Sequence, residues 1–407
     1  MATDNNHKIP NVPALRFPEF TDEWELHQTT DYFTFKNGLN PEAKRFGSGT
    51  KFISVMDILN NHYITYDKII ASVEPKENDL KEYGVNYGDI LFQRSSETLE
   101  DVGRANVYLD TKTALFGGFV IRGKKIGNYN PLFFRYMLSC PHVRKKIIVK
   151  GAGAQHFNIG QDGLSKVMLF VPKEKEQLRI GQFLNQIDER ISIQNKIIED
   201  LRQLKSALTE KLIDDFVKKV PIVAFEQLYR TAGEGGTPDT CKREYYDNGT
   251  VPFIKIDDLT NKYLLRNKDY ITELGLSKSS AWIIPANSVI FSNGATIGAA
   301  SINRYDVATK QGILGIVPKE GVDVEYLYYL MTSMSFRREI NRIVTHGTMA
   351  TAYLKDINKI LVPLPTIEEQ IKTIRKLSSI SRKEEVEVQL LQLLQVKKQF
   401  LLQQMFI

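Results

Sequence analysis

The second half of this chain repeats the pattern of its first half. Phe170–Pro172 leads into Glu176-Gln177, and Val362–Pro365 leads into Glu369-Gln370 in the same order. The shift from Pro172 to Pro365 is 365 − 172 = 193 residues, and Gln177 and Gln370 are separated by the same distance in sequence. A repeat of this length strongly limits the fold, because both halves must be able to form the same structure.

Further matches lie upstream of these two segments. Phe52–Ile58 resembles Phe253–Leu259, and Gly88–Phe92 resembles Asn287–Phe291. Each half therefore consists of a mixed module followed by a stretch that favours a long helix. A unit that occurs twice suggests a protein that contacts two related things at once.

Composition indicates an ordinary soluble protein. With 407 residues the chain is too long for one typical domain, and 42% hydrophobic with 25% charged residues is usual for globular proteins. No apolar run approaches the roughly 20 residues that span a bilayer, and the N-terminus lacks a signal-peptide core. The two cysteines, Cys140 and Cys241, are far apart and form no disulfide framework. We therefore expect a cytoplasmic protein.

The charge is mildly basic. Lys and Arg number 54 against 48 Asp and Glu, which gives a net charge of +6. This balance permits phosphate contacts with nucleic acid but does not establish them.

Both modules look strand-rich with late helices. Short β-type runs are broken by Gly, Asn and Asp at short intervals, which favours many short strands over βαβ units. Helical patches follow at Pro131–Leu138 and Tyr326–Met331. The predicted fold class is α+β.

Each module is followed by a stretch with no Gly and no Pro. Gln182–Val220 could extend over roughly 58 Å as a helix, and Pro221 stops it. In the second stretch, Thr366–Ile407, a capping box of Thr366 and Glu369 marks the helix start. The apolar stripes are Ile187, Ile191, Ile197, Leu201, Leu204, Leu208 and Leu212 in the first, and Ile371, Ile374, Leu377, Val386, Leu390, Leu394, Leu401 and Met405 in the second.

The two stripes match in register, which predicts that the helices pair. Leu201, Leu208 and Leu212 fall 193 residues before Leu394, Leu401 and Met405. We expect an antiparallel coiled coil that buries both stripes. The alternative is that each helix closes its own module, although a module of about 150 residues offers little surface for so long a helix.

These features resemble the DNA-specificity subunit of type I restriction–modification systems. The resemblance covers nearly the whole chain and is carried by Phe253–Leu259, the Gly235-Gly236-Thr237-Pro238 turn, Tyr87–Thr98, Phe116–Arg122 and the Pro-x3-Glu-Gln entries to both helices. The first copy lacks Gly-Gly-Thr-Pro, and its Asn37-Gly38 region is a looser match.

The resemblance implies two target-recognition domains, each reading one half of a split double-stranded DNA site, with the helices setting the gap. It also implies that the helices dock two methyltransferase subunits, to which two nuclease-translocase subunits can add. We expect the domains at residues 1–172 and 221–365, and the helices at residues 173–220 and 366–407.

No catalytic motif is complete in this sequence. Gly118–Lys124 has the spacing of a phosphate-binding loop, but Lys125 stands where Ser or Thr is needed. The six histidines lack metal-ligand spacing, and Asn130–Phe133 only partly matches an amino-methyltransferase motif. We therefore expect a non-catalytic subunit without cofactor or metal.

Bidentate side chains on loops are the candidates for reading bases. Gln93–Ser96 follows a β-type run, and Ser292–Thr296 occupies the matching position in the second module. For any one of these residues a solvated turn is the simpler interpretation, but the match in both copies favours DNA for the group. The predicted DNA-binding residues are Gln93, Arg94, Ser95, Ser96, Arg104, Arg122, Lys255, Asn293, Thr296, Lys310 and Gln311.

An alternative function is a coiled-coil adaptor that assembles partner proteins without reading DNA. In both hypotheses the helices bind partners, and the predicted residues of the spacer helices are Ile187, Ile191, Leu201, Leu208, Leu212, Leu390, Leu394, Leu401 and Met405. Substitutions at Arg94 or Asn293 distinguish the two, because only a DNA reader would change its sequence preference.

Overall fold

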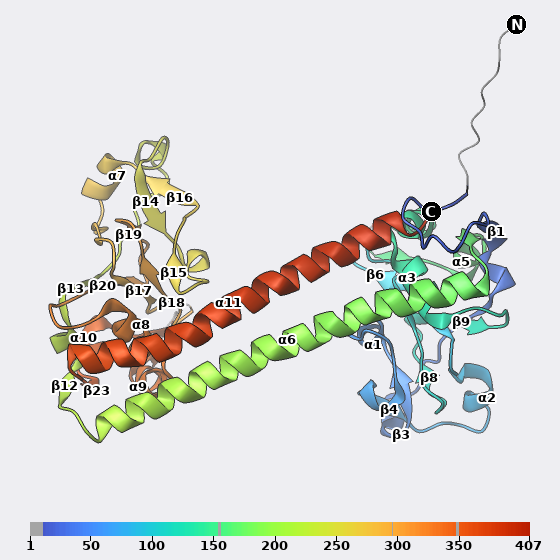
Figure 1. Ribbon diagram of the computed structural model, residues 1–407, viewed down its shortest axis with the longest axis horizontal. Coiled ribbons are helices and arrows are strands. Elements are labelled where there is room, and N and C mark those ends of the chain that lie inside the picture. The colour runs from blue at the N-terminus through green and yellow to red at the C-terminus, as the bar shows by residue number, and fades with distance from the viewer. Residues whose placement is uncertain (1–10, 154–155, 295, 347–349) are drawn as a thin grey trace, which may run out of the picture. The chain divides into compact units, whose positions relative to one another are not determined.

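Two long helices run through a chain that is otherwise built from short strands and short helices. The computed structural model describes residues 11–153, 156–294, 296–346 and 350–407 (Figure 1). Contacts divide the chain into unit 1, which is Met1–Asn195 with Gln389–Ile407, and unit 2, which is Lys196–Val388. Helices α6 (Glu174–Val217) and α11 (Ile367–Gln404) each contribute to both units.

Unit 1 contains a four-stranded antiparallel sheet in the order β2-β9-β5-β7 and a three-stranded sheet in the order β4-β3-β8. A separate pair, β1 with β11, leads into α6. The strands are β1 (Glu25–Gln28), β2 (Phe33–Asn37), β3 (Phe46–Ile53), β4 (Ser72–Val73), β5 (Ile90–Gln93), β6 (Ser95–Ser96), β7 (Ala105–Val107), β8 (Leu115–Phe116), β9 (Val120–Lys125), β10 (Phe157–Asn158) and β11 (Met168–Val171). The short helices are α1 (Val55–Asn60), α2 (Asp79–Tyr83), α3 (Pro131–Ser139), α4 (Pro141–Ile148) and α5 (Gln161–Ser165).

Unit 2 has the same topology, with one more strand in its main sheet. The orders are β13-β20-β17-β18-β15 and β16-β14-β19, and β12 pairs with β23 before α11 begins. The strands are β12 (Ile222–Ala224), β13 (Tyr229–Glu234), β14 (Val251–Ile254), β15 (Tyr263–Leu264), β16 (Asp269–Ile271), β17 (Val289–Ser292), β18 (Ala300–Asn303), β19 (Ala308–Thr309), β20 (Ile313–Pro318), β21 (Thr345–His346), β22 (Ala350–Thr351) and β23 (Leu361–Pro363). The short helices are α7 (Glu273–Ser277), α8 (Val324–Thr332), α9 (Met334–Ile343) and α10 (Leu354–Ile357). The two-copy design and the α+β class are thus confirmed.

The predicted helical patches are α3 and α8, which form the centre of each unit's main core. Their aromatic faces are buried beside the main sheet, with Phe133, Phe134 and Tyr136 in α3, and Tyr326 and Tyr329 in α8. Asn130 caps α3 through Phe133 N, and Asp323 caps α8 through Glu325 N. The capping residues Asn130 and Asp323 are again 193 residues apart, so the repeat extends to the helix starts.

A buried glutamine explains the Glu-Gln entries to both long helices. Gln177 Oε1 accepts a hydrogen bond from Asn130 N at 2.9 Å, and its Nε2 donates to Pro172 O. Gln370 makes the same pair of bonds with Asp323 N and Pro365 O. Each amide thereby fixes a long helix to the N-terminus of α3 or α8.

Helix α6 begins at Glu174, before the Gly-free stretch Gln182–Val220, so Gly181 lies inside it. A Cβ at this position would come within 2.7 Å of Asn130 Oδ1 and 3.0 Å of Phe133 N. Glycine here permits the close approach of α3 and outweighs its low helix propensity. At α11 the predicted capping box is present, since Thr366 N donates to Glu369 Oε2 and Glu369 N to Thr366 Oγ1.

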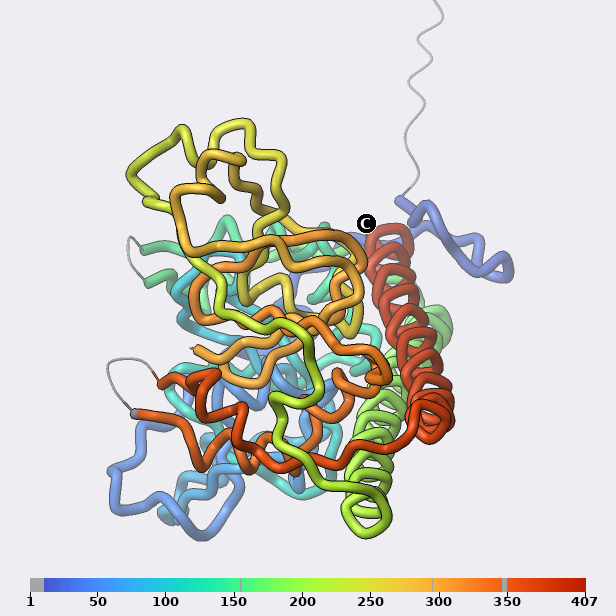
Figure 2. Tube along the Cα trace, turned by 90° about the vertical axis from the view of Figure 1, so that its left-hand side faces the viewer, coloured from blue at the N-terminus to red at the C-terminus, as the bar shows by residue number. Residues whose placement is uncertain are grey.

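The two long helices run antiparallel, as predicted. In unit 1, Lys398 of α11 pairs with Asp188 of α6, and in unit 2, Glu384 of α11 pairs with Arg202 of α6. Residue numbers therefore fall along one helix as they rise along the other. The segments of α6 and α11 that belong to unit 2 lie side by side in Figure 2.

Most of the predicted stripe residues are at least partly buried. Ile187, Leu401 and Met405 are buried, and Ile191, Leu201, Leu208, Leu212, Leu390 and Leu394 are half-buried. Leu204, Ile371 and Val386 were predicted in the stripes but are exposed. Successive positions three and four residues apart drift around a helix of 3.6 residues per turn, so members of a long stripe leave the contact face.

Candidate nucleic-acid interface

Three loops of unit 1 meet at the end of strand β5. Arg94 N donates to Phe119 O at 2.9 Å, and Ile159 N donates to Arg94 O at 2.9 Å. Arg94 thus joins the loop before β9 to the segment after β10. The short strands β6 and β10 pair here, and Ser95 Oγ donates to Asn158 Oδ1. We name these loops, residues 94–104, 117–119 and 151–159, the unit 1 loop junction; residues 154–155 lie outside the described residues.

The equivalent loops of unit 2 are joined by the same backbone bonds. Asn293 N donates to Gly312 O at 3.0 Å, and Ala352 N donates to Asn293 O at 2.9 Å. Asn293 therefore occupies the place of Arg94, and Gly312 that of Phe119. We name residues 293–299, 310–312 and 345–352 the unit 2 loop junction; residues 295 and 347–349 lie outside the described residues.

The Gly-Gly-Thr-Pro turn of unit 2 lies beside its loop junction. Gly235 N donates to Ile313 O, and Gly236 N donates to Thr309 O. A Cβ at Gly235 would lie 2.1 Å from Thr309 O, so this close approach requires glycine. In unit 1 the same two bonds are made by Gly38 N to Val120 O and Leu39 N to Phe116 O. The loosely matching Asn37-Gly38 region is therefore the structural counterpart of the turn.

The predicted residues of unit 1 fall into exposed and buried groups. Arg94, Ser95 and Ser96 are half-buried at the junction, where Arg94 Nη1 lies 3.4 Å from Gly118 O. Arg104 is exposed and pairs with Asp101 at 2.6 Å. Gln93 is buried, and its Nε2 donates to Ser95 O.

Arg122 lies within the protein rather than at its surface. Its guanidinium donates to the carbonyl oxygens of Gly84 and Glu82, and it lies over the ring of Phe116. Burial lowers the pKa of Arg122, and the charge of Asp89 opposes this shift. The side chain is thus held among internal acceptors and offers almost no surface to DNA.

Some of the predicted DNA-binding residues of unit 2 lie close together in the structure. Lys310 and Gln311 are exposed, and Lys310 N donates to Ile254 O, next to Lys255. Lys255 Nζ pairs with Asp269 at 2.8 Å. Thr296 is exposed, whereas Asn293 is fully buried with Nδ2 donating to Ala352 O. Lys310, Gln311 and Thr296 are therefore the accessible polar side chains of this group.

Sequence reasoning did not select Phe119 as a candidate. The ring is 69% exposed at the unit 1 loop junction. It stands directly before β9, whose first four residues are all buried, so the apolar run Phe-Val-Ile reads as a continuous strand. The backbone bond from Arg94 N to Phe119 O identifies its place, and that pairing cannot be read from sequence spacing.

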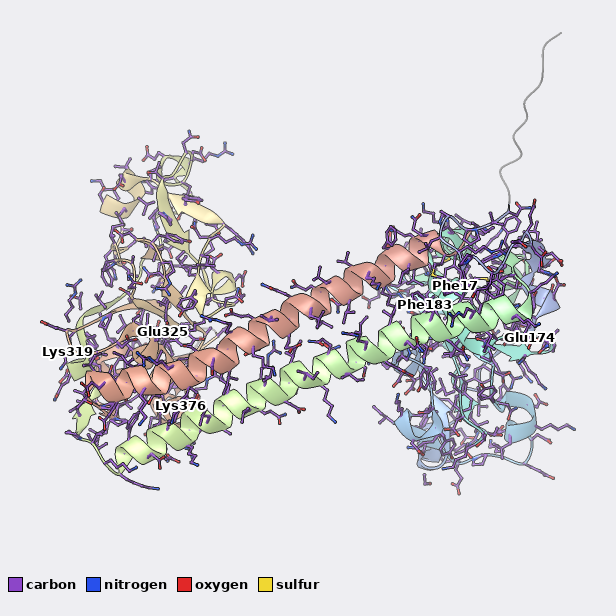
Figure 3. The ribbon with its side chains drawn as sticks, in the orientation of Figure 1. Phe17, Glu174, Phe183, Lys319, Glu325 and Lys376 are labelled. Atoms are coloured by element: carbon purple, nitrogen blue, oxygen red, sulfur yellow. The ribbon has the colours of Figure 1, made fainter. Side chains whose placement is uncertain are left out.

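A second set of contacts fixes each module to the long helices. In unit 1, the carboxylate of Asp188 in α6 has four polar partners within 3.4 Å. These are the side chains of Lys398, His62, Arg135 and Tyr136. Phe17 meets Phe183 of α6 edge-on at 5.6 Å (Figure 3). In unit 2, Glu325 and Lys262 lie 2.6 Å apart, and Lys262 Nζ also approaches Ser378 of α11 (Figure 3).

The helices also carry exposed apolar side chains. Leu393, Val396 and Phe400 are exposed at a spacing of three and four residues on the unit 1 part of α11. This spacing places them on one helix face, which we name the α11 stripe. Exposed apolar side chains that share one face are a candidate surface for protein contact.

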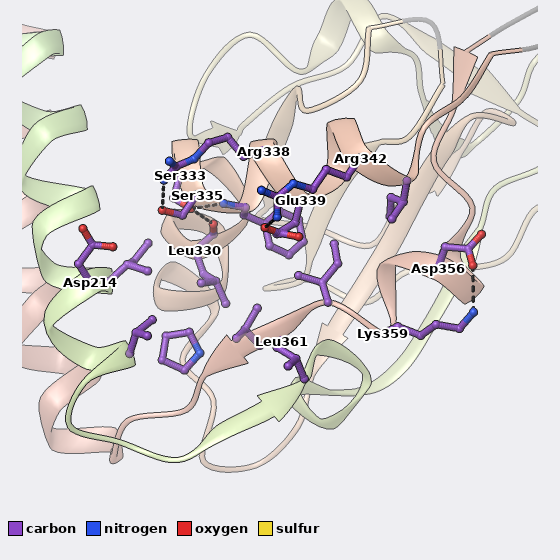
Figure 4. A pocket seen from close by; sticks show the side chains of 17 residues that line it. Asp214, Leu330, Ser333, Ser335, Arg338, Glu339, Arg342, Asp356, Lys359 and Leu361 are labelled. Atoms are coloured by element: carbon purple, nitrogen blue, oxygen red, sulfur yellow. Dashed lines mark hydrogen bonds and ion pairs between the residues drawn. The ribbon is translucent and has the colours of Figure 1, made fainter.

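Unit 2 contains a cavity of about 640 Å³ between the end of α6, helix α9 and strand β23 (Figure 4). Its apolar wall includes Ile213, Leu330 and Phe336, and among its charged residues Arg342 pairs with Glu339 and Lys359 with Asp356. None of the described residues of the unit 2 loop junction lines the cavity.

Two searches of the described residues gave negative results. No group of three or more His, Cys, Asp and Glu side chains is arranged to hold a metal ion in that part of the chain. Nor is any of the described helices both long and apolar enough to cross a membrane.

Comparison with known proteins connects this architecture to a family. The model of the type I restriction modification DNA specificity domain matches residues 21–203 and again residues 230–396. The chain belongs to this family. Each match covers one repeated module and ends within the long helix that follows it.

Relatives of this specificity-domain chain include two proteins of Methanocaldococcus jannaschii. The MjaX specificity subunit is 24% identical over 415 residues, which cover 94% of this chain and 94% of that subunit. The MjaVIII specificity subunit is also 24% identical, over 92% of this chain and 91% of that subunit. The EcoR124I/EcoR124II subunit of Escherichia coli is 29% identical over 35% of this chain and 38% of its own.

Solved structures show the same fold. The type I restriction–modification S subunit from M. genitalium superposes with a TM-score of 0.56 at 16% identity, covering 97% of this chain and 99% of the other. A chain from a study of complex assembly and conformational transition in the type I restriction–modification system superposes with a TM-score of 0.59 at 12% identity. The superposition covers 93% of this chain and 96% of the other.

Proposed function

We propose that this specificity-domain chain is the non-catalytic DNA-reading subunit of a type I restriction–modification complex. Each module, at residues 1–172 and 221–365, reads one half of a split, asymmetric double-stranded DNA site. The helices at residues 173–220 and 366–407 set the gap between the halves. The complex works in the cytoplasm.

One observation carries the assignment of the reading surface. The two loop junctions are built with the same backbone bonds, yet the polar side chains that they carry differ. Arg94, Ser95 and Ser96 stand in unit 1, and Lys310, Gln311 and Thr296 in unit 2. A common scaffold with different polar groups suits two modules that read different base sequences, because Arg, Lys and Gln recognise different base edges.

Partner binding falls to the long helices. The α11 stripe would be covered when a methyltransferase subunit docks, since burial of apolar surface drives association. The repeat supplies two related docking positions, which supports two methyltransferase subunits, to which restriction subunits can add. The positions 193 residues before the stripe are Asp200, Gln203 and Ala207, so the two docking surfaces differ in hydrophobicity.

The deciding experiment is co-expression with a type I methyltransferase subunit, followed by genome-wide mapping of methylated sites. A split motif with a fixed gap is the expected result. A stable complex without any sequence motif would favour the adaptor alternative and contradict the reading role. Leu393→Asp tests docking separately, because it should prevent copurification of the methyltransferase, whereas Leu361→Asp, also exposed but on β23, should not.

A further inference from the structure

Phe119 is an exposed aromatic side chain at the unit 1 loop junction. With 69% of its surface exposed, the ring has lost little water on folding. Exposure of one large apolar side chain is common on protein surfaces, so its position must carry the argument. That position is the point where Arg94 joins the loop before β9, with the guanidinium 3.4 Å from the adjacent Gly118 O.

The backbone around Phe119 is held on both sides. Gly38 N donates to Val120 O, Val120 N to Gly117 O, and Gly117 N to Ile53 O, all within 3.1 Å. The neighbouring turn packs so closely that a Cβ at Gly118 would lie 2.0 Å from Asn40 Oδ1. The ring is therefore presented outward by a loop with little freedom, and binding it would cost little conformational entropy.

The chemistry of the position suits a nucleic-acid base. Arg94 supplies a cation for a guanine edge or a phosphate, and the ring of Phe119 supplies an apolar surface for a thymine methyl group in the major groove. Neighbouring Ser95 and Ser96 add hydroxyl groups that donate and accept hydrogen bonds. In unit 2 the equivalent position is Gly312, with a φ of +84°, so no ring occupies this position.

We propose that Phe119 makes an apolar contact with a base in the DNA half-site read by the first module. This inference rests on the proposed function and adds a specificity-determining residue to it. The second module reads its half-site without an aromatic contact at the equivalent position. The two half-sites are thus recognised by different chemistry on the same scaffold.

The test compares Phe119→Ala with Ile126→Ala in the complex with the methyltransferase. Ile126 is 56% exposed and follows the other end of β9, about 20 Å along a strand of this length. The probe is a duplex that carries the motif found by methylation mapping. Phe119→Ala should weaken binding to this duplex about tenfold, in the range of base–aromatic contacts. Ile126→Ala should leave the affinity unchanged.

Two further readouts separate base contact from a structural role. Phe119→Ala should relax the methylated motif in one half only, and it should leave the salt dependence of binding unchanged because no charge is lost. Unchanged affinity and motif would overturn the inference while the proposed function stands. Loss of preference in both halves, or a lower melting temperature, would also overturn it. If the wild-type complex shows no sequence preference at all, the proposed function fails as well.

Discussion

The Lys398 ammonium lies 2.6 Å from the Asp188 carboxylate and joins α11 to α6 within unit 1. The same carboxylate accepts from Tyr136 OH at 2.9 Å and lies 3.1 Å from His62 Nδ1. Asp188 thus connects α6 and α11 with α3, through Tyr136, and with the segment that contains His62. A buried carboxylate with this many partners holds the module on the helices, and its removal leaves several donors unpaired.

Replacement of this carboxylate should destabilise the protein strongly. Asp188→Ala should lower the free energy of unfolding by about 3–5 kcal/mol, because Lys398 and Arg135 would stay partly buried without their counter-charge. Denaturant titration of the purified chain measures the change. Asp200→Ala is the matched control, an exposed aspartate of the same helix that should change stability by no more than about 0.5 kcal/mol. Equal effects of the two substitutions would contradict a special role for Asp188.

The same residue predicts how stability depends on pH. Burial alone would raise the pKa of Asp188, but the hydrogen bond with His62 and the charge of Lys398 outweigh it, and the pKa lies well below its usual value. A carboxylate with a lowered folded-state pKa stabilises the fold above its unfolded pKa of about 3.9, and this contribution is lost as pH falls further. The difference in stability between wild type and Asp188→Asn should therefore be full at pH 7 and shrink below about pH 4. A difference that stays constant from pH 7 to pH 3 would show that the ionised form is not favoured.

Two arginines that look alike in sequence should behave differently. Arg94→Ala should weaken binding of the complex to its specific duplex by about tenfold or more, as for loss of one bidentate base contact, with an unchanged melting temperature. Arg122→Ala should lower the free energy of unfolding by about 1–3 kcal/mol, because the carbonyls of Gly84 and Glu82 lose a buried donor. Binding assays and thermal melts on both variants distinguish these roles. If Arg94→Ala lowered the melting temperature, the result would contradict the assignment of Arg94 to the DNA-reading surface.

The architecture could be predicted from the sequence because the repeat marks every major element twice. The 193-residue spacing separates Gln177 from Gln370, and it also separates the start of α3 from the start of α8. Both pairs keep this spacing because each copy needs the same buried contacts. The Gly-free stretch Gln182–Val220 alone does not include the start of α6 at Glu174, because Gly181 lies inside the helix as a contact position for α3. The sequence alone does not show which glycines end a helix and which lie inside it at a close contact with another helix.

The sequence could match the candidate loops of the two modules to each other, but it could not indicate which of their side chains face outward. The loops after β5 and β17 were correctly matched to each other, as their backbone bonds show. Whether a polar side chain at such a loop faces outward depends on partners far away in sequence. Asn293 is buried because Ala352 O accepts from it, and Arg122 is buried because carbonyls near residue 83 accept from it. Neither partner can be inferred from local sequence.

Neighbouring residues in unit 2 should separate phosphate contacts from base contacts. Lys310 and Gln311 are both exposed at the unit 2 loop junction. Lys310→Gln removes one positive charge, so the slope of log affinity against log salt concentration should decrease by about one. Gln311→Ala should leave this slope unchanged and alter sequence preference instead. Equal slopes for wild type and Lys310→Gln would show that Lys310 does not contact the DNA backbone.

The proposed role of the helices as a spacer predicts a defined change in the DNA site. The Asp188–Lys398 and Arg202–Glu384 pairs define a register in which residues 195–201 of α6 correspond to residues 385–391 of α11. Deleting both segments removes seven residues from each helix, keeps those ion pairs, and shortens the helices by about 10.5 Å. Because base pairs stack at about 3.4 Å, the gap between half-sites should shrink by about three base pairs, with both half-sites unchanged.

Methylation mapping of the complex measures the gap directly. The matched control is an insertion of seven helix-forming residues at the same two positions, which should lengthen the gap by about three base pairs. A deletion in only one helix breaks the register and should reduce stability rather than yield a new gap. If the paired deletion folds, binds the methyltransferase and still methylates sites with the original gap, the helices do not set the spacing, and the distance between half-sites must be fixed by the partner subunits.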